Sequence, residues 1–245
     1  MEQITVKKEP LGDGFCVYTS PHHTFGTDAV LLANFSKSRK KEKMVDIGTG
    51  CGIIPLLLLR DKCLESAVGI DISNEACTLA ERTAAELALH NFTVINSDIK
   101  EIKGKTEFGI NTLVTCNPPY KAASGGLKNE DSVIRVARHE VACSLNDIVS
   151  AAAKLLQTSG RLCMCHRPER LAELIDIMRE NKIEPKRLRL VAQRIGKEPW
   201  LVLLEGKKCA NTGLRIMPTL YVEDENGNFS SEMIEIYGKY KEEYL

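Results

Sequence analysis

The chain has 245 residues, 43% of them hydrophobic and 27% charged, so it is long enough to bury a substantial core and has an ordinary globular composition. Its 33 basic residues balance its 33 acidic ones, and this zero net charge excludes a generally basic nucleic-acid binder but leaves room for a local basic face. The sequence starts without a signal-peptide pattern and contains no apolar run of membrane-spanning length, so we expect a cytoplasmic protein without a membrane partner.

The first elements expected along the chain are short. Phe15, Val17 and Tyr18 lie between glycines and a proline, which predicts a strand or hairpin ahead of the main fold. A helix should follow, with Thr27 as its N-cap, because a threonine hydroxyl can accept a backbone hydrogen bond there. That helix either packs on the core alone or also covers a ligand site, and both interpretations stay open. The basic run at 37–43 is most simply a solvated linker.

Residues 43–52 predict a strand, a tight turn and the start of a helix, because a short apolar run stops at Gly48, Gly50 and Gly52. Glycines suit a turn that needs positive φ, and they remove the Cβ atoms that would keep a ligand away from the backbone. Asp46 precedes them, so the spacing is D-x-G-x-G-x-G, which favours a ligand without a pyrophosphate over a dinucleotide. A turn that binds nothing remains the alternative.

Beyond the glycine turn, helical and strand patterns alternate. This alternation predicts an α/β protein with a doubly wound, mostly parallel sheet, and two successive strands at the end favour one antiparallel member. We expect residues 43–245 to form this domain and residues 1–42 to form an extension packed on it. Helices are expected at 52–61, 74–89, 145–157 and 168–181, and strands at 66–71, 92–97, 111–116, 160–166, 186–194 and 200–206.

Polar side chains occur where the expected strands end. In a doubly wound sheet, ligands bind outside the carboxyl ends of the strands, so Asp46, Asp71, Asp98 and Asn117 should converge on one crevice. Asp71 has the position of a carboxylate that accepts hydrogen bonds from both hydroxyls of a ribose. Asp98 can accept a hydrogen bond from an adenine amino group, or it can simply cap the next helical turn.

The stretch Asn117-Pro118-Pro119-Tyr120 follows the expected strand at 111–116. Two prolines fix φ and prevent regular pairing, so the backbone is rigid and its carbonyls turn outward. A side-chain amide beside a rigid carbonyl gives two acceptors for a planar amino group, and the tyrosine offers a ring on which a base can stack. A bare turn is the alternative interpretation.

The nine cysteines lie in otherwise apolar runs, which is typical of reduced core residues in a cytosolic protein. Cys163 and Cys165 are two apart on an expected strand and share one face. They lack a second pair of ligands, so we expect no metal site.

Two motifs carry a resemblance to known families. The glycine turn resembles the first motif of class I S-adenosylmethionine-dependent methyltransferases, and N-P-P-Y resembles the motif of methyltransferases that act on amino groups. Taken in order along nearly the whole chain, these and three further segments resemble the bacterial tRNA(Val) adenine-N6 methyltransferase family. The further segments are Thr24–Leu32, Ala137-Arg138-His139-Glu140, and Leu214–Pro218 with Tyr221.

The resemblance implies a Rossmann-like fold with a seven-stranded sheet, S-adenosylmethionine as cofactor, and tRNA as partner. It implies that Asn117 and the Pro118 carbonyl hold the target amino group, that Pro119 keeps the motif rigid, and that Tyr120 stacks on the base. No strong general base is then needed, and His139 is a further candidate contact. The cofactor contacts it implies are Thr27, Asp46, Gly48, Gly50, Gly52, Asp71, Ile72, Asp98, Ile99 and Asn117.

Several alternatives remain open at the level of sequence. Another amino-methyltransferase, acting on an rRNA or DNA base or on a protein glutamine, would share N-P-P-Y, and a catalytically silent module that binds cofactor or RNA would share the fold. Glutamine methyltransferases normally carry an N-terminal helical domain, and only a short segment precedes the first core strand here. The oligomeric state is not predicted, and a monomer is compatible. Basic residues that could meet phosphates are 37–43, Lys186, Arg187, Arg189, Arg194, Lys197, Lys207 and Lys208.

Overall fold

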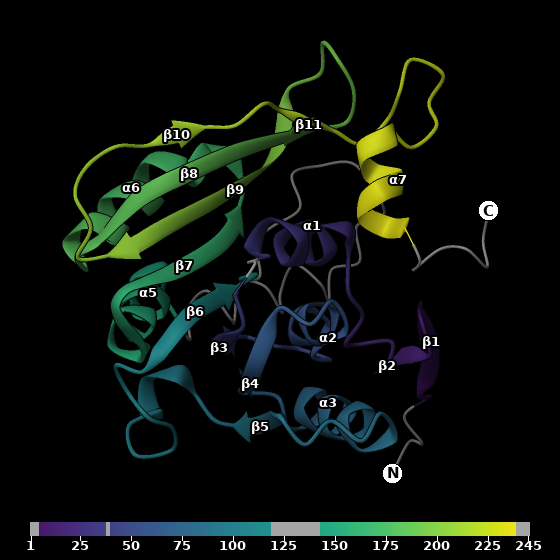
Figure 1. The fold of residues 1–245 in the computed structure, drawn as a ribbon, viewed down its shortest axis with the longest axis vertical. Coiled ribbons are helices and arrows are strands. Elements are labelled where there is room, and N and C mark those ends of the chain that lie inside the picture. Colours follow the sequence, from purple (N-terminus) through teal and green to yellow (C-terminus); the bar gives the residue numbers. More distant parts are fainter. Residues whose placement is uncertain (1–4, 38–39, 119–142, 239–245) are drawn as a thin grey trace.

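The computed structural model describes residues 5–37, 40–118 and 143–238 (Figure 1). The strands are β1 (Lys7–Gly12), β2 (Phe15–Thr19), β3 (Glu42–Ile47), β4 (Leu64–Asp71), β5 (Phe92–Asn96), β6 (Asn111–Cys116), β7 (Leu156–His166), β8 (Ile183–Ala192), β9 (Pro199–Lys208), β10 (Arg215–Ile216) and β11 (Leu220–Tyr221). The helices are α1 (Thr27–Ser36), α2 (Ile53–Arg60), α3 (Asn74–Glu86), α5 (Leu145–Leu155), α6 (Leu171–Glu180) and α7 (Ser231–Tyr237), with short 3-10 turns η1 (Ile99–Glu101) and η2 (Pro168–Arg170).

The central sheet has the strand order β5-β4-β3-β6-β7-β9-β8. Among these described strands, β9 is antiparallel to both of its neighbours and the other adjacent pairs are parallel. The predicted mostly parallel sheet with one antiparallel strand is therefore confirmed, but the sheet has nine described strands instead of seven. The short strands β10 and β11, which pair with β8, were not predicted. We call the side where the parallel strands end the carboxyl edge and the opposite side the amino edge.

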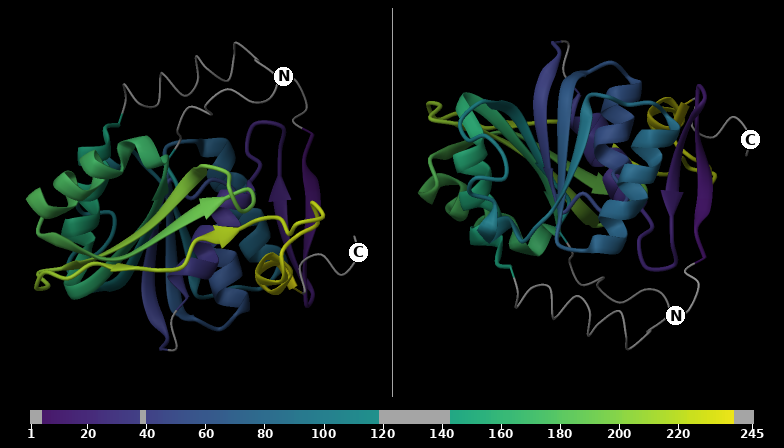
Figure 2. Two further views of the ribbon diagram at one scale, coloured as in Figure 1. Left: turned by 90° about the horizontal axis from the view of Figure 1, so that it is seen from above. Right: turned by 90° about the horizontal axis from the view of Figure 1, so that it is seen from below.

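Helices cover both faces of this sheet. Figure 2 shows α5 and α6 on one side and α2 and α3 on the other. Two hydrophobic clusters correspond to these faces, and neighbouring residues of one strand belong to different clusters, as Met44 and Val45 of β3 do. Successive strand side chains point to opposite faces, so a nearly continuous apolar strand fills two cores.

The predicted N-terminal hairpin is confirmed as the antiparallel pair β1 and β2, which lies against α3. The Tyr18 backbone N–H donates to Thr83 Oγ1 at 3.0 Å, and the Arg82 guanidinium lies 4.1 Å from the centroid of the Tyr18 ring. The buried side chains Leu11 and Val17 join the same core cluster as α1 and α2. The division of the chain at residue 42 stays a prediction.

One capping prediction is wrong. Helix α1 begins at Thr27, and its N-cap position is Gly26, which has an extended backbone. Glycine has no side chain that could cap the helix. Thr27 Oγ1 instead accepts a hydrogen bond from the hydroxyl of Tyr237, at 3.1 Å. Tyr237 lies on α7, which the sequence analysis did not predict, and α7 packs on α1. Ser73 caps α3, because its hydroxyl accepts from Ala76 N–H at 3.3 Å.

A buried ion-pair network crosses the strands toward the amino edge. Arg161 of β7 contacts Glu42 of β3 at 2.6 Å and Glu205 of β9 at 2.7 Å, and Arg187 of β8 contacts Glu205 at 2.8 Å. Arg161 also donates to the carbonyl of Ser36, the last residue of α1, at 2.7 Å. Burial alone would raise the pKa of Glu205, but the charges of Arg161 and Arg187 outweigh it and lower that pKa. The network fastens α1 to the sheet.

Candidate functional site

The candidate site lies at the carboxyl edge, where β3 is the common neighbour of β4 and β6. In the registers of these pairs, Ile47 lies opposite Ile70 and Cys116. Gly48 and Asn117 therefore leave adjacent strands at the same level. The sheet thus brings the glycine turn and the N-P-P-Y motif side by side, as the convergence argument predicted.

The three glycines of the turn all have positive φ, at 70° for Gly48, 56° for Gly50 and 84° for Gly52. At Gly52 an added Cβ would lie 3.2 Å from the Ala80 Cβ and 3.3 Å from the Phe92 ring, so this glycine serves helix packing. At Gly48 and Gly50 a Cβ would meet no atom of the described residues within 4 Å. Open space therefore lies over these two glycines, and a ligand can approach their backbone there.

Asp71 holds the glycine turn in shape. Its carboxylate accepts the backbone N–H of Gly50 at 2.8 Å and the backbone N–H of Ser73 at 2.9 Å, through one oxygen each. Each oxygen keeps a second lone pair, so the half-buried carboxylate can accept further hydrogen bonds. Ile72, the next residue, is 52% exposed, which is unusual for a large apolar side chain and suits contact with a flat apolar ligand group.

Asp46 lies fully buried behind the turn. Its Oδ1 accepts from the Thr115 hydroxyl at 2.5 Å, while its Oδ2 and the Thr49 hydroxyl are buried without a hydrogen-bond partner in the described residues. Burial raises the pKa of Asp46 to about 7, and the neighbouring hydroxyls of Thr115 and Thr49 offset part of that effect. The Asp46 Oδ2 and the Thr49 hydroxyl are closed off from solvent, so a contact of Asp46 with a cofactor stays a prediction.

Asp98 shows the capping arrangement that the sequence left open. Its Oδ1 accepts from Lys100 N–H at 2.9 Å, which caps η1, and its other oxygen lies 3.6 Å from Lys100 Nζ. Ile99 is buried in a core cluster. Contacts of Asp98 and Ile99 with a cofactor stay predictions.

Asn117 is half-buried at the end of β6, and Pro118 behind it is buried. The Asn117 Oδ1 accepts a hydrogen bond from the thiol of Cys165 on β7 at 2.9 Å. Cys165 is fully buried, and burial raises its pKa far above its ordinary value, so the thiol stays protonated and remains a donor. The Asn117 oxygen keeps one lone pair for another partner. Pro119, Tyr120 and His139 lie outside the described residues.

Sequence reasoning missed several side chains that shape this edge. Thr115 lies directly opposite Asp46 in the β3–β6 register, which no local pattern indicates. Cys165 resembled an ordinary core cysteine. His23 Nε2 lies 2.9 Å from Ser73 Oγ, which joins the N-terminal segment to the start of α3.

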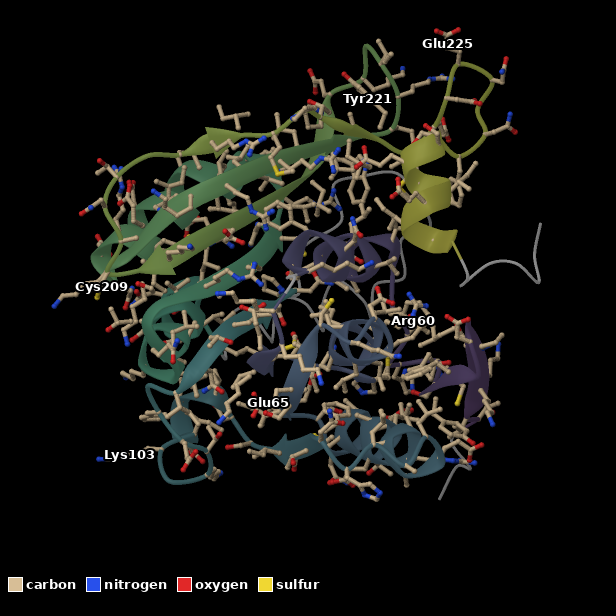
Figure 3. All side chains as sticks on the ribbon, in the orientation of Figure 1. Arg60, Glu65, Lys103, Cys209, Tyr221 and Glu225 are labelled. Atoms are coloured by element: carbon tan, nitrogen blue, oxygen red, sulfur yellow. The ribbon has the colours of Figure 1, made fainter. Side chains whose placement is uncertain are left out.

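Some basic residues named as phosphate contacts lie far from this edge. Strand β9 runs antiparallel to the others, and Lys207 and Lys208 at its end pair with Glu184 and Ile183 at the start of β8. In Figure 3, Cys209 marks that amino edge and Tyr221, beside the end of β8, marks the opposite one. Lys207 and Lys208 could meet phosphates only if they shared a face with the crevice, and they lie at the other edge. Lys40 and Lys41 also precede β3 at the amino edge, and Lys43 lies near the start of that strand.

Others of these basic residues are already engaged within the protein. Lys186 donates to the carbonyl of Asn211 at 3.1 Å, and Arg189 pairs with Glu232 at 2.6 Å. Arg187 belongs to the buried ion-pair network. Arg194 and Lys197, in the connection between β8 and β9, lie at the carboxyl edge and are exposed.

Among the described residues, no group of three or more His, Cys, Asp and Glu side chains could hold a metal ion. No helix within those residues is long and apolar enough to cross a membrane.

The model of one protein family, described as the methyltransferase small domain, matches residues 15–181. Several similar curated proteins carry the name tRNA1(Val) (adenine(37)-N6)-methyltransferase. The protein from Parabacteroides distasonis is 33% identical over 164 residues, which cover 66% of this chain and 67% of that protein. The protein from Porphyromonas gingivalis is 28% identical over 224 residues, covering 86% of each chain.

Solved structures agree on the fold. A predicted O-methyltransferase from Agrobacterium tumefaciens superimposes with a TM-score of 0.69 at 18% identity, covering 87% of this chain and 97% of the other. The geranyl diphosphate C-methyltransferase of Streptomyces coelicolor, solved with S-adenosyl-L-homocysteine, gives a TM-score of 0.53 at 13% identity and covers 74% of this chain and 78% of the other.

Proposed function

Because this chain belongs to the methyltransferase small domain family, we propose that it methylates N6 of an adenosine in tRNA, with S-adenosylmethionine as methyl donor. That the protein is a methyltransferase follows from the family. The donor, the atom that is methylated and the RNA are the parts we add. The names of its relatives support adenine N6 and tRNA.

The residues at the carboxyl edge fit S-adenosylmethionine. Open space over Gly48 and Gly50 lets the ligand lie against the backbone, and the Asp71 carboxylate has lone pairs left for ribose hydroxyls. Exposed Ile72 suits its adenine. Bound there, S-adenosylmethionine would supply an activated methyl group on a sulfonium sulfur.

The protein's task is then to position the adenine amino nitrogen. The Asn117 side-chain oxygen and the Pro118 carbonyl would each accept one amino N–H, which turns the nitrogen lone pair toward the donor. Because the Cys165 thiol donates to the Asn117 Oδ1, it fixes the orientation of the Asn117 side-chain amide, with the oxygen and not the NH2 group toward the thiol. Held this way, the amino nitrogen would take the methyl group as the bond from the methyl carbon to sulfur breaks, and the extra proton would leave to solvent.

One observation carries this proposal: the strand register puts Asn117 beside the glycine turn. An acceptor pair for an amino group and a place for the methyl donor are therefore adjacent in one crevice. Placing two reactants together in the correct geometry is a large part of what such a displacement needs.

The test is incubation of the protein with isotope-labelled S-adenosylmethionine and tRNA that lacks N6-methyladenosine, followed by mass spectrometry of the nucleosides. We expect labelled N6-methyladenosine, and almost none with Asn117→Ala. Label on a guanine, or on a protein glutamine when protein substrates are offered, would contradict the proposal and favour a neighbouring amino-methyltransferase. Cofactor binding without any methyl transfer would favour a silent binding module.

A further inference from the structure

We infer that the connection between β8 and β9, residues 193–198 with Trp200, binds the RNA strand next to the target adenosine. The inference rests on the proposed function, because it names the surface that would hold the substrate of that site. Its occupant is a single-stranded stretch of RNA, recognised through phosphates and through unstacked bases.

The location of this connection follows from the sheet. Strand β8 is parallel to β3 and β6, and its last residue, Ala192, lies beyond the level at which β6 ends, because Cys116 is level with Leu188 across β7 and β9. Three strand spacings across the sheet and about four residues along it separate Asn117 from Gln193, or roughly 20 Å. A base received at Asn117 would therefore place nucleotides a few positions along the RNA strand within reach of this connection.

The connection has a defined shape. The N–H of Lys197 donates to the carbonyl of Arg194 at 3.1 Å, and Gly196 has a φ of 80°, as expected for the third residue of a type II turn. Ile195, at the second position, is 73% exposed, more than any other large hydrophobic side chain of the described residues. The turn therefore presents an apolar side chain between two cationic ones.

The two cations have no ion pair within the described part of the chain. Arg194 and Lys197 are exposed, whereas Arg161, Arg179, Arg187 and Arg189 are paired with carboxylates. An unpaired guanidinium or ammonium group is available for phosphate, and a guanidinium can also stack on a base.

A pocket of about 660 Å³, open to solvent, adjoins the turn. The half-buried Trp200 ring contributes an aromatic surface to its lining, of the kind on which bases stack. Glu198 and Glu223 line it too, and Glu223 accepts from the Gln193 side chain at 2.6 Å. Because two carboxylates line the pocket, it is not a general anion site. Phosphate binding therefore depends on the positions of Arg194 and Lys197.

The test is binding of a fluorescently labelled, unmodified tRNA1(Val) transcript, measured by anisotropy at several salt concentrations. The double variant Arg194→Ala and Lys197→Ala should raise Kd about tenfold near physiological salt. The slope of log Kd against log salt should fall by about 1.5, the value for two lost phosphate contacts. Glu198→Gln should have the opposite effect and tighten binding slightly.

The matched control is Lys41→Ala with Lys43→Ala, which removes the same charge from exposed positions at the amino edge. It should leave both Kd and the slope unchanged. Equal effects of the two double variants, or none from either, would overturn the inference while the proposed function stands. If the wild-type protein neither binds nor methylates the transcript, the proposed function fails and takes this inference with it.

Discussion

The two edges of the central sheet differ in how their polar groups are satisfied. Toward the amino edge, Arg161 contacts both Glu42 and Glu205, and Lys208 Nζ donates to the Leu156 carbonyl at 2.7 Å. At the carboxyl edge, the Asp46 Oδ2 and the Thr49 hydroxyl are buried without partners in the described residues. The Ser36 hydroxyl and the Arg187 Nε are also buried without a partner toward the amino edge, but both buried carboxylates there, Glu42 and Glu205, are paired with arginines. Asp46 has no ion pair within the described residues.

This difference concerns how buried charge is compensated. A buried carboxylate paired with arginines contributes to stability as a pair, whereas the charge of a buried carboxylate without a cationic partner depends on pH. The buried ion pairs should therefore affect stability when removed, and the residues of the crevice at the carboxyl edge should affect ligand binding and turnover. The following predictions test that division.

The largest effect is expected from Arg161→Ala, which leaves Glu42 and Glu205 as buried charges with less compensation. Removing one partner of a buried pair destabilises a protein by about 3–5 kcal/mol. Urea unfolding should show this loss, while turnover per folded molecule stays close to that of the wild type. Arg179→Ala, which breaks the exposed pair with Glu184, is the control and should hardly change stability. A similar loss in both variants would refute the contrast.

The second prediction concerns Asn117→Ala at the carboxyl edge. Losing one positioned polar contact with the reacting group typically costs a hundredfold or more, roughly 3 kcal/mol in the barrier. We expect kcat to fall by about that factor while affinity for S-adenosylmethionine, measured by calorimetry, changes little. Normal turnover combined with lost cofactor binding would place Asn117 in the cofactor pocket instead.

The third prediction concerns Asp46, whose pKa is raised to about 7 in the folded protein. A folded-state pKa above the unfolded value means that Asp46 stabilises the protein fully below about pH 4, and that this contribution is lost as the pH rises through 7. Between pH 5 and pH 8 the loss should be about 2–3 kcal/mol. Asp46→Asn, which keeps an acceptor for Thr115, should lack this loss. Parallel urea unfolding curves for both proteins across that range would contradict it.

The fourth prediction separates backbone strain from ligand contact at the glycine turn. Gly50→Ala and Gly227→Ala both place a Cβ in open space at positive φ, so each should lose a similar stability of about 1 kcal/mol. Only Gly50→Ala should also weaken binding of S-adenosylmethionine, by tenfold or more, because its methyl group occupies the proposed ligand space. Calorimetry showing equal affinities in the two variants would remove Gly50 from the cofactor site.

The smallest effect is expected at Cys165, a positioning residue that acts through Asn117. Cys165→Ala removes one hydrogen bond and should lower kcat by about threefold to tenfold, with KM for both substrates unchanged. Cys165→Ser restores a donor and should recover much of that loss. An equal loss in both variants, matched by equal loss of stability, would point to packing alone.

The sequence by itself determined the elements and the identity of the motifs. Its apolar runs, the glycines at 48, 50 and 52, and the serine cap of α3 act within one turn or strand, so local pattern predicts them. The rigid Asn117-Pro118 step is local for the same reason. These features were sufficient to predict the fold class and a crevice at the carboxyl ends of the strands.

Only the tertiary structure decided which distant groups meet. Thr115 beside Asp46, Cys165 beside Asn117 and Tyr237 beside Thr27 each join strands or helices far apart in the chain, through register and packing that no local window contains. The same holds for the basic residues. Lys197 and Lys207 are both lysines, one just before β9 and one near its end. The antiparallel course of β9 therefore places Lys197 at the carboxyl edge and Lys207 at the amino edge.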